Sequence, residues 1–169
     1  MTAKDLERLL TQHGIGVAKL DAVTRKLRAA GHLPKGGRGS NAPHITATEA
    51  ALVLIAVAGS AKGNEADARI EKLLPMSSTK SPRAQRTLLD AVSELLGQGF
   101  DLAEVAELRV GRTSRYAAIH SINGEIEEFV RSSTNTHSDR FSVEGIVPSS
   151  LLKRIALGLL PANTRDLEP

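Results

Sequence analysis

Apolar side chains recur at helical spacing along the first thirty residues. Leu6, Leu9 and Leu10 define the apolar side of a predicted helix over residues 2–12. A second helix is predicted over residues 17–30, where the apolar positions lie three or four residues apart, at Val17, Leu20, Val23 and Leu27. Glycines lie in the short segment between them. Two helices joined by a short glycine-containing turn are characteristic of a helix-turn-helix motif.

The middle of the chain predicts three more helices. Residues 47–58 are apolar almost all round, which is typical of a helix buried on several sides, and the spacing of Thr46 and Glu49 is that of a capping box. Residues 64–74, and residues from 81 or 82 to 96, also repeat apolar side chains at helical spacing. Between these two helices lies a polar segment bounded by prolines, residues 75–82, which is the best candidate for a hinge.

After Gly99 the pattern changes to short extended runs. We expect strands over residues 105–110, 116–122, 125–131 and 140–147, with a type I′ hairpin turn at Asn123–Gly124 and a last helix after Pro148. The expected fold class is therefore α+β, with a mainly α winged helix-turn-helix that carries a short β wing, then a small antiparallel sheet flanked by helices. We predict a DNA-binding domain over residues 1–75, a linker over 76–86, and an oligomerisation or partner-binding domain over 87–169.

A basic hairpin is predicted directly after the second helix. Gly31 stands where a helix C-cap is expected, and the residue before Pro34 is restricted to extended conformations. Residues 35–41, KGGRGSN, would form the tip, and residues 42–46 would return as the second extended piece. A basic helix followed by a basic hairpin is what a winged helix-turn-helix uses to dock on duplex DNA. The alternative is a solvated linker.

The distribution of charge supports the DNA-binding interpretation. Residues 1–60 contain 8 Lys and Arg against 4 Asp and Glu, whereas residues 61–169 contain 14 against 15. A basic excess confined to one part of the chain favours a polyanionic partner there. The residues that we expect to contact DNA are Lys19, Thr24, Arg25, Lys26 and Arg28 on the second helix, and Lys35, Gly37, Arg38, Ser40 and Asn41 in the tip. Arg109, Arg112 and Arg115 could also bind phosphate, although exposed arginines are common in turns.

Composition narrows the remaining function classes. The chain has no cysteine, which excludes disulfides and thiolate metal sites, and its aromatic content of 2% argues against base-stacking platforms for single strands or RNA. We find no convergent catalytic set and expect no enzyme, cofactor or metal. The first residues lack the apolar core of a signal peptide, and no apolar run approaches the roughly 18 residues of a membrane span. We therefore expect a cytoplasmic protein without a membrane partner.

The N-terminal third, about residues 1–60, resembles the compact winged helix-turn-helix domains of phage and prophage DNA-binding proteins. That group includes small regulators and the small subunits of phage terminases. The segment Gly31, His32, Leu33 and Pro34 also loosely resembles the GLLP-like turn before the wing of MerR-type regulators. The chain departs from those regulators because it has neither a long dimerising coiled coil nor a cysteine effector site.

The resemblance and the residue pattern together predict a sequence-specific binder of double-stranded DNA, a transcription regulator of phage or mobile-element type. One alternative is a terminase small subunit that recognises viral DNA for packaging. Another alternative is a protein–protein adaptor whose winged fold no longer binds DNA. We expect a homo-oligomer, because paired half-sites give far more affinity than one small module. The C-terminal half would serve oligomerisation or contact a protein partner.

Overall fold

The computed structural model describes residues 1–34, 43–80, 86–98, 100–131 and 143–160. Within these residues six α-helices and a five-stranded antiparallel sheet form an α+β fold, which confirms the predicted fold class. The helices are α1 (Ala3–Gln12), α2 (Val17–Ala29), α3 (Ala47–Gly59), α4 (Ala66–Leu73), α5 (Leu88–Gln98) and α6 (Ser149–Leu159), with short 3-10 turns η2 (Gly63–Glu65) and η3 (Phe100–Ala103). Among these helices, none is both long and apolar enough to cross a membrane.

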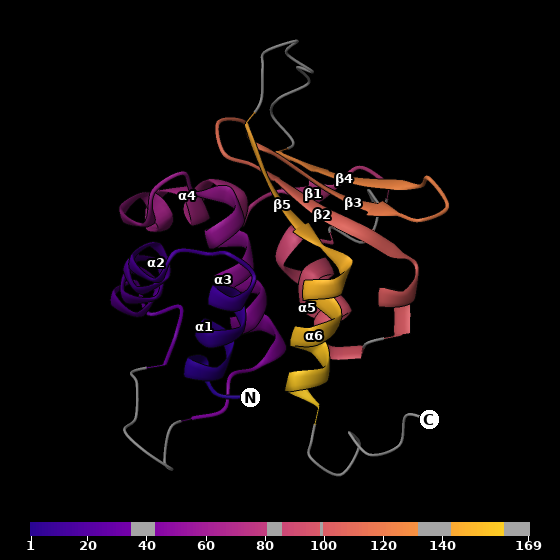
Figure 1. Ribbon diagram of the computed structural model, residues 1–169. Coiled ribbons are helices and arrows are strands. Elements are labelled where there is room, and N and C mark those ends of the chain that lie inside the picture. Colours follow the sequence, from indigo (N-terminus) through magenta and orange to yellow (C-terminus); the bar gives the residue numbers. More distant parts are fainter. Residues whose placement is uncertain (35–42, 81–85, 99, 132–142, 161–169) are drawn as a thin grey trace.

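The sheet has the strand order β1-β4-β3-β2-β5. Its strands are β1 (Ser77–Ser78), β2 (Val105–Gly111), β3 (Tyr116–Ser121), β4 (Ile126–Val130) and β5 (Glu144–Pro148). Helices α5 and α6 lie against one side of the sheet, and α1 to α4 lie beside them (Figure 1). Strand β2 lies between β3 and β5, so Leu108 is paired with Ile119 on β3 and with Val147 on β5.

Alternation along the strands separates an inner from an outer face of the sheet. The inner face is made of buried apolar side chains, namely Leu108, Val110, Ala117, Ile119, Phe129 and Val147. The outer face carries Glu107, Arg109, Tyr116 and Glu128 together with Ile146, which is 55% exposed. This alternation is what an antiparallel sheet with one packed face and one solvated face requires.

Helix α3 is the centre of the hydrophobic core. Each of its residues from Ala50 to Gly59 is buried, as the nearly uninterrupted apolar run predicted. A single cluster of buried side chains runs from Leu6 on α1 through α3 to Ala156 on α6. The two predicted domains therefore share one core.

Capping side chains stand at the starts of three helices, α1, α3 and α5. Thr2 with Asp5 and Thr46 with Glu49 form capping boxes at the starts of α1 and α3. The predicted helix from residue 81 or 82 starts later, at Leu88. There the Thr87 hydroxyl accepts from the backbone N–H of Asp90, and the Asp90 carboxylate accepts from the backbone N–H of Thr87. Residues 77–78, predicted as linker, instead form β1 beside β4.

The hairpin between β3 and β4 differs from the predicted type I′ turn. The backbone N–H of Gly124 donates to the carbonyl of Ser121, so Ile122 and Asn123 are the central residues rather than Asn123 and Gly124. Gly124 follows with a φ of +87°. A turn followed by a left-handed glycine is the usual three-residue hairpin loop.

Candidate nucleic-acid interface

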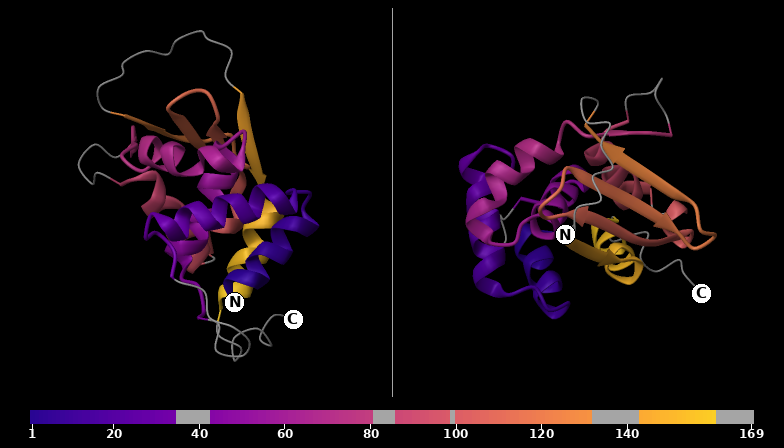
Figure 2. Two further views of the ribbon diagram at one scale, coloured as in Figure 1. Left: turned by 90° about the vertical axis from the view of Figure 1, so that its left-hand side faces the viewer. Right: turned by 90° about the horizontal axis from the view of Figure 1, so that it is seen from above.

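The helices α1 and α2 are joined by the four residues His13–Gly16, and α2 lies across α1 (Figure 2). Gly14 has a φ of +86°, and the backbone N–H of Ile15 donates to the carbonyl of Leu10 while that of Gly14 donates to Thr11. These two bonds are a Schellman motif, in which a left-handed glycine ends a helix and turns the chain. The structure therefore has the predicted arrangement of two helices joined by a glycine-containing turn.

Helix α2 ends in the same way. Gly31 has a φ of +79°, the backbone N–H of His32 donates to Leu27, and that of Gly31 donates to Arg28. The predicted glycine stop of this helix is therefore confirmed. Leu33 then turns into the core and holds the chain against the helices as it leaves α2.

Two of the five predicted contact residues of α2 are buried or half-buried and donate hydrogen bonds to backbone carbonyls. The Thr24 side chain is 2% exposed, and its hydroxyl donates to the carbonyl of Asp21. Lys19 is half-buried, and its Nζ donates to the carbonyls of Val57 at 2.8 Å and Ser60 at 2.7 Å. Thr24 therefore faces the core, and Lys19 caps the end of α3.

The other three predicted residues of α2 form ion pairs. Arg25 pairs with Asp21 one turn earlier, Lys26 pairs with Asp67 at the start of α4, and Arg28 pairs with Glu7 on α1. The Arg25 and Asp21 side chains are 72% and 66% exposed, whereas those of Arg28 and Glu7 are both 32% exposed. Exposed pairs contribute little to stability and exchange partners easily, so Arg25 and Lys26 are more available to a ligand than Arg28.

The predicted tip residues Lys35, Gly37, Arg38, Ser40 and Asn41 lie outside the described residues. After them, His44 pairs with Thr2 in an isolated antiparallel bridge, and the backbone N–H of Ile45 donates to the carbonyl of Met1. The returning piece thus pairs with the N-terminus of the chain, and not with residues 32–34 as the wing prediction implied.

The C-terminal end of α3 is surrounded by basic side chains from three other parts of the chain. Besides Lys19, Arg69 on α4 donates from Nε to the carbonyl of Gly59 at 3.1 Å, and Arg112 donates from Nε to that of Ala58 at 3.1 Å. Arg69 also bonds the carbonyls of Gly111 and Ser114. The last carbonyls of a helix have no partner within the helix, and here cations supply the donors.

For two of these three cations, the sequence pattern predicts a different role. Lys19 was predicted to contact DNA, and Arg112 was noted among the turn arginines, but Arg69 carried no signal. Of the three turn arginines, Arg109 is engaged elsewhere, in ion pairs with Glu107 and Glu144 on the outer face of the sheet. Only the tertiary structure shows which arginine reaches α3.

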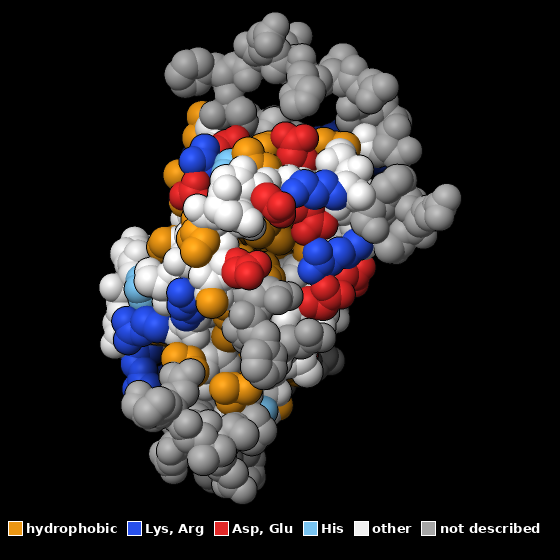
Figure 3. Space-filling model, turned by 90° about the vertical axis from the view of Figure 1, so that its right-hand side faces the viewer, with side chains coloured by type: hydrophobic (Ala, Val, Ile, Leu, Met, Phe, Trp, Pro, Cys, Tyr) orange, Lys and Arg blue, Asp and Glu red, His pale blue; other side chains and the backbone are white. Residues whose placement is uncertain are grey.

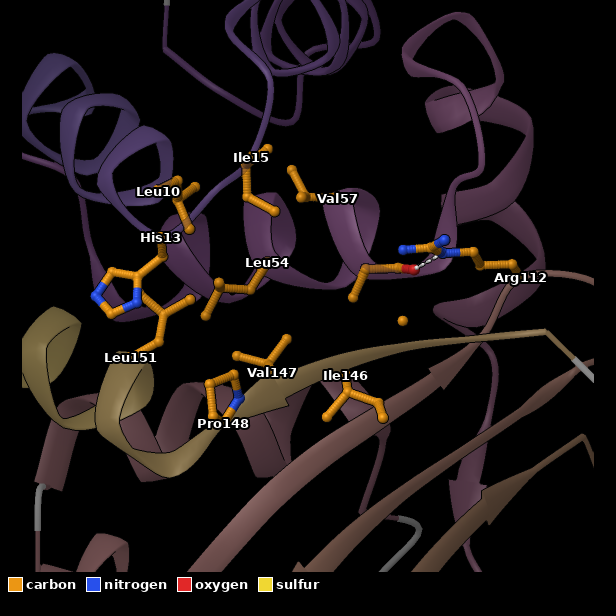
Figure 4. A pocket seen from close by; sticks show the side chains of 12 residues that line it. Leu10, His13, Ile15, Leu54, Val57, Arg112, Ile146, Val147, Pro148 and Leu151 are labelled. Carbon is orange, nitrogen blue, oxygen red and sulfur yellow. Dashed lines mark hydrogen bonds between the residues drawn. The ribbon is translucent and has the colours of Figure 1, made fainter.

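A narrow groove runs from α1 along α3 to β5 (Figure 4). Apolar side chains such as Ile15, Leu54 and Val147 form its walls, and His13 and Arg112 lie at its two ends. Its cavity of about 90 Å³ is much smaller than the roughly 300–1,000 Å³ of pockets that enclose small-molecule ligands. Within the described part of the chain, no group of three or more metal-ligating side chains could hold a metal ion.

Comparisons of the chain with protein-family models, curated proteins and solved structures found no match. The geometry of these residues is therefore the basis on which a function is proposed.

Proposed function

We propose that the protein binds duplex DNA sequence-specifically, with α2 as the helix that enters the major groove. The observation that carries the proposal is the helix-turn-helix formed by α1, the glycine turn and α2. In this class the N-terminal part of the second helix reaches base edges. Val17, 66% exposed, and Ala18, also exposed, stand in the first turn of α2. Small apolar side chains of this kind suit close approach and contact with a thymine methyl group.

Arg25 and Lys26 are the contacts that we propose for DNA on this helix. Each is held by a carboxylate that is itself well exposed, with exposed fractions of 66% for Asp21 and 37% for Asp67. Phosphate oxygens can replace such carboxylates at small cost. Arg28 and Glu7 instead tie α2 to α1, which fixes the angle at which α2 is presented.

The biological role we propose is transcription regulation of phage or mobile-element type, in the cytoplasm where such DNA resides. Recognition of viral DNA for packaging is the alternative within the same class. The mass of the assembly distinguishes the two, because a packaging ring contains about eight or more subunits and a regulator is typically a dimer.

The test is a binding assay with labelled duplexes, first of random sequence and then selected from genomic fragments, over roughly 50 to 200 mM salt. We expect affinity to fall steeply with salt and to weaken severalfold in Arg25→Ala and Lys26→Ala. The matched control is Lys153→Ala, which removes an exposed cation on α6. Absence of binding at low salt, or equal weakening in the control, would reject the proposal.

A second candidate function is that of a protein–protein adaptor or oligomerisation module, and one observation favours it. Large apolar side chains stand exposed on the outer face of the sheet and at its margins, with exposed fractions of 55% for Ile146, 48% for Val143, 40% for Ile126 and 71% for Ile122. Figure 3 shows hydrophobic side chains interspersed with acidic and basic ones on one side of the molecule. Such apolar groups mark interaction surfaces when they are contiguous. Light scattering of the wild type and of Ile146→Asp tests this candidate, because a smaller mass in the variant assigns the face to self-association.

A further inference from the structure

Three basic side chains bind carbonyls at the end of α3, and a fourth, Arg115, directly follows Ser114, whose carbonyl Arg69 also binds. We name Lys19, Arg69, Arg112 and Arg115 the α3 cationic cluster. Three of them hold consecutive carbonyls, because Lys19 binds those of Val57 and Ser60, Arg112 that of Ala58, and Arg69 that of Gly59. Arg115 stands exposed in the turn between β2 and β3. Residues far apart in sequence thus place three positive charges around one helix end, and Arg115 adds a fourth in the adjoining turn.

The cluster carries more positive charge than the helix end requires. The C-terminus of a helix is equivalent to roughly half a negative charge, whereas these side chains supply four full positive charges. Among the described residues, none of the four has a carboxylate within ion-pair distance. Half-buried cations without a counter-charge are costly, so an anion at this place would stabilise them.

Burial and neighbouring positive charge both act on the ionisation of two members of the cluster. Burial lowers the pKa of Lys19, and the nearby charge of Arg112 lowers it further. Burial also lowers the pKa of Arg69, with a smaller contribution from Arg115. The neighbouring charges that these two groups feel are therefore cationic, and this supports the absence of a compensating acid.

Among the described residues, the carbonyls do not use all the donors of the α3 cationic cluster. The described contacts use two of the three N–H groups of Lys19 and only the Nε of Arg112, so the terminal nitrogens of Arg112 have no protein acceptor among the described residues. Arg112 also lines the groove, at the end opposite His13 (Figure 4). A guanidinium with free terminal N–H groups is well shaped for the paired oxygens of a phosphate.

We propose that the α3 cationic cluster is a phosphate-binding site, and that its ligand is a backbone phosphate of the DNA bound by α2. This inference rests on the proposed function, because Lys19 lies in the first turn of α2 and links the cluster to the helix that would enter the groove. A phosphate held there would fix the position of the duplex relative to the start of α2, as phosphate contacts do in other complexes. A free phosphate ion has the same chemistry, so the experiment separates the two sources.

The first arm of the test uses inorganic phosphate as the probe. Isotope-labelled protein is titrated with phosphate at constant ionic strength set by chloride, and amide shifts are followed. We expect saturable shifts confined to residues near the α3 terminus and the turn at 112–115, and a roughly fivefold weaker affinity in Arg115→Gln.

This variant keeps the fold, since Arg115 is exposed and makes no bond to a described residue. Lys153→Gln is the matched control. The absence of saturable shifts, or equal affinity in Arg115→Gln and the wild type, overturns the phosphate site.

The second arm repeats the salt series with duplex DNA. If a backbone phosphate is the ligand, Arg115→Gln lowers the slope of the logarithm of affinity against the logarithm of salt concentration by about one, and phosphate competes with DNA. An unchanged slope with weakened phosphate binding overturns the DNA assignment and leaves a free phosphate as the ligand. Phosphate binding by a wild type that binds no DNA rejects the proposed function while the site itself stands.

Discussion

Gly145 on β5 lies directly against the backbone of Ala58 in the last turn of α3. A Cβ atom at position 145 would overlap the carbonyl group of Ala58, to which the Nε–H of Arg112 donates its hydrogen bond. Because glycine has no side chain, the backbone of β5 can lie in direct contact with the backbone of α3. This contact joins the sheet to the helices and builds one wall of the groove next to the α3 cationic cluster.

Gly145→Ala is expected to lower the free energy of unfolding by about 2 to 3 kcal/mol, because neither backbone can move freely to accommodate the added methyl group. Urea unfolding followed by circular dichroism measures the change. Gly97→Ala is the matched control. Gly97 is an exposed residue of α5, its added Cβ would lie 3.5 Å from that of Ala47, and helix propensity predicts a gain of about 0.5 to 1 kcal/mol. Equal stability of Gly145→Ala and the wild type would contradict the close contact.

Arg69→Met is expected to destabilise the fold by about 1 to 3 kcal/mol. The substitution keeps much of the apolar stem but removes the guanidinium that donates to the carbonyls of Gly59, Gly111 and Ser114. Lys72→Met, an exposed position on the same helix, should change stability by no more than about 0.5 kcal/mol. Similar unfolding midpoints for the two variants would show that Arg69 is not the donor these carbonyls require.

The Glu7–Arg28 pair is expected to be worth more than the Asp21–Arg25 pair. The first joins α1 to α2 with both side chains 32% exposed, and the second lies within one helix with exposed fractions of 66% and 72%. Double-mutant cycles to alanine should give a coupling of about 1 kcal/mol for the first pair and about 0.3 kcal/mol for the second. The reverse order would mean that Glu7–Arg28 does not hold the two helices together.

Tyr116 should ionise well above the ordinary tyrosine range. Burial, followed by the charge of Glu128 and the hydrogen bond to it, raises the pKa of Tyr116 to about 12. Because the folded-state pKa is raised above the unfolded value of about 10, the neutral phenol stabilises the fold fully below about pH 10, and this contribution is lost as the pH rises towards 12. Absorbance near 295 nm reads this titration directly, since Tyr116 is the single tyrosine and the chain has no tryptophan. Glu128→Gln should move the pKa back towards 10, and a wild-type midpoint near 10 would contradict the packing of this side chain.

Asp21→Asn is expected to strengthen DNA binding roughly threefold to tenfold at low salt, because it removes a charge that repels phosphates and frees Arg25. Glu104→Gln changes the net charge of the protein equally, at an exposed position before β2. A gain in Asp21→Asn alone would assign the contact to α2. Equal gains in both variants would indicate a general effect of charge and would count against α2 as the recognition helix.

Local rules predicted most elements of this protein from its sequence. Capping residues set the starts of α1 and α3, glycines set the ends of α1 and α2, and the change of period after Gly99 marked the strands. These predictions succeed because capping, glycine conformation and hydrophobic periodicity act over a few residues. The sequence did not predict strand β1, because two serines in a polar segment carry no periodic pattern. The pairing of β1 with β4 is a long-range contact.

The candidate site was predictable only in part. The sequence placed a basic helix after a glycine turn, and the structure has that helix. Periodicity divides a helix into faces but does not show which neighbour each face meets. It therefore could not show that Thr24 turns inward, that Lys19 reaches the end of α3, or that Arg28 pairs with Glu7.

The sequence by itself determined most of the helices and strands and the buried character of α3, because these follow from the order of side chains along a short stretch. The tertiary structure alone decided which charges meet. It brought Lys19, Arg69 and Arg112 to one helix end, and Arg115 to the adjoining turn, from positions up to 96 residues apart. It also joined α3 to the sheet through a glycine whose role no local pattern reveals. Electrostatic neighbours depend on packing between distant segments, so the function proposed for this surface is encoded in the fold rather than in any single motif.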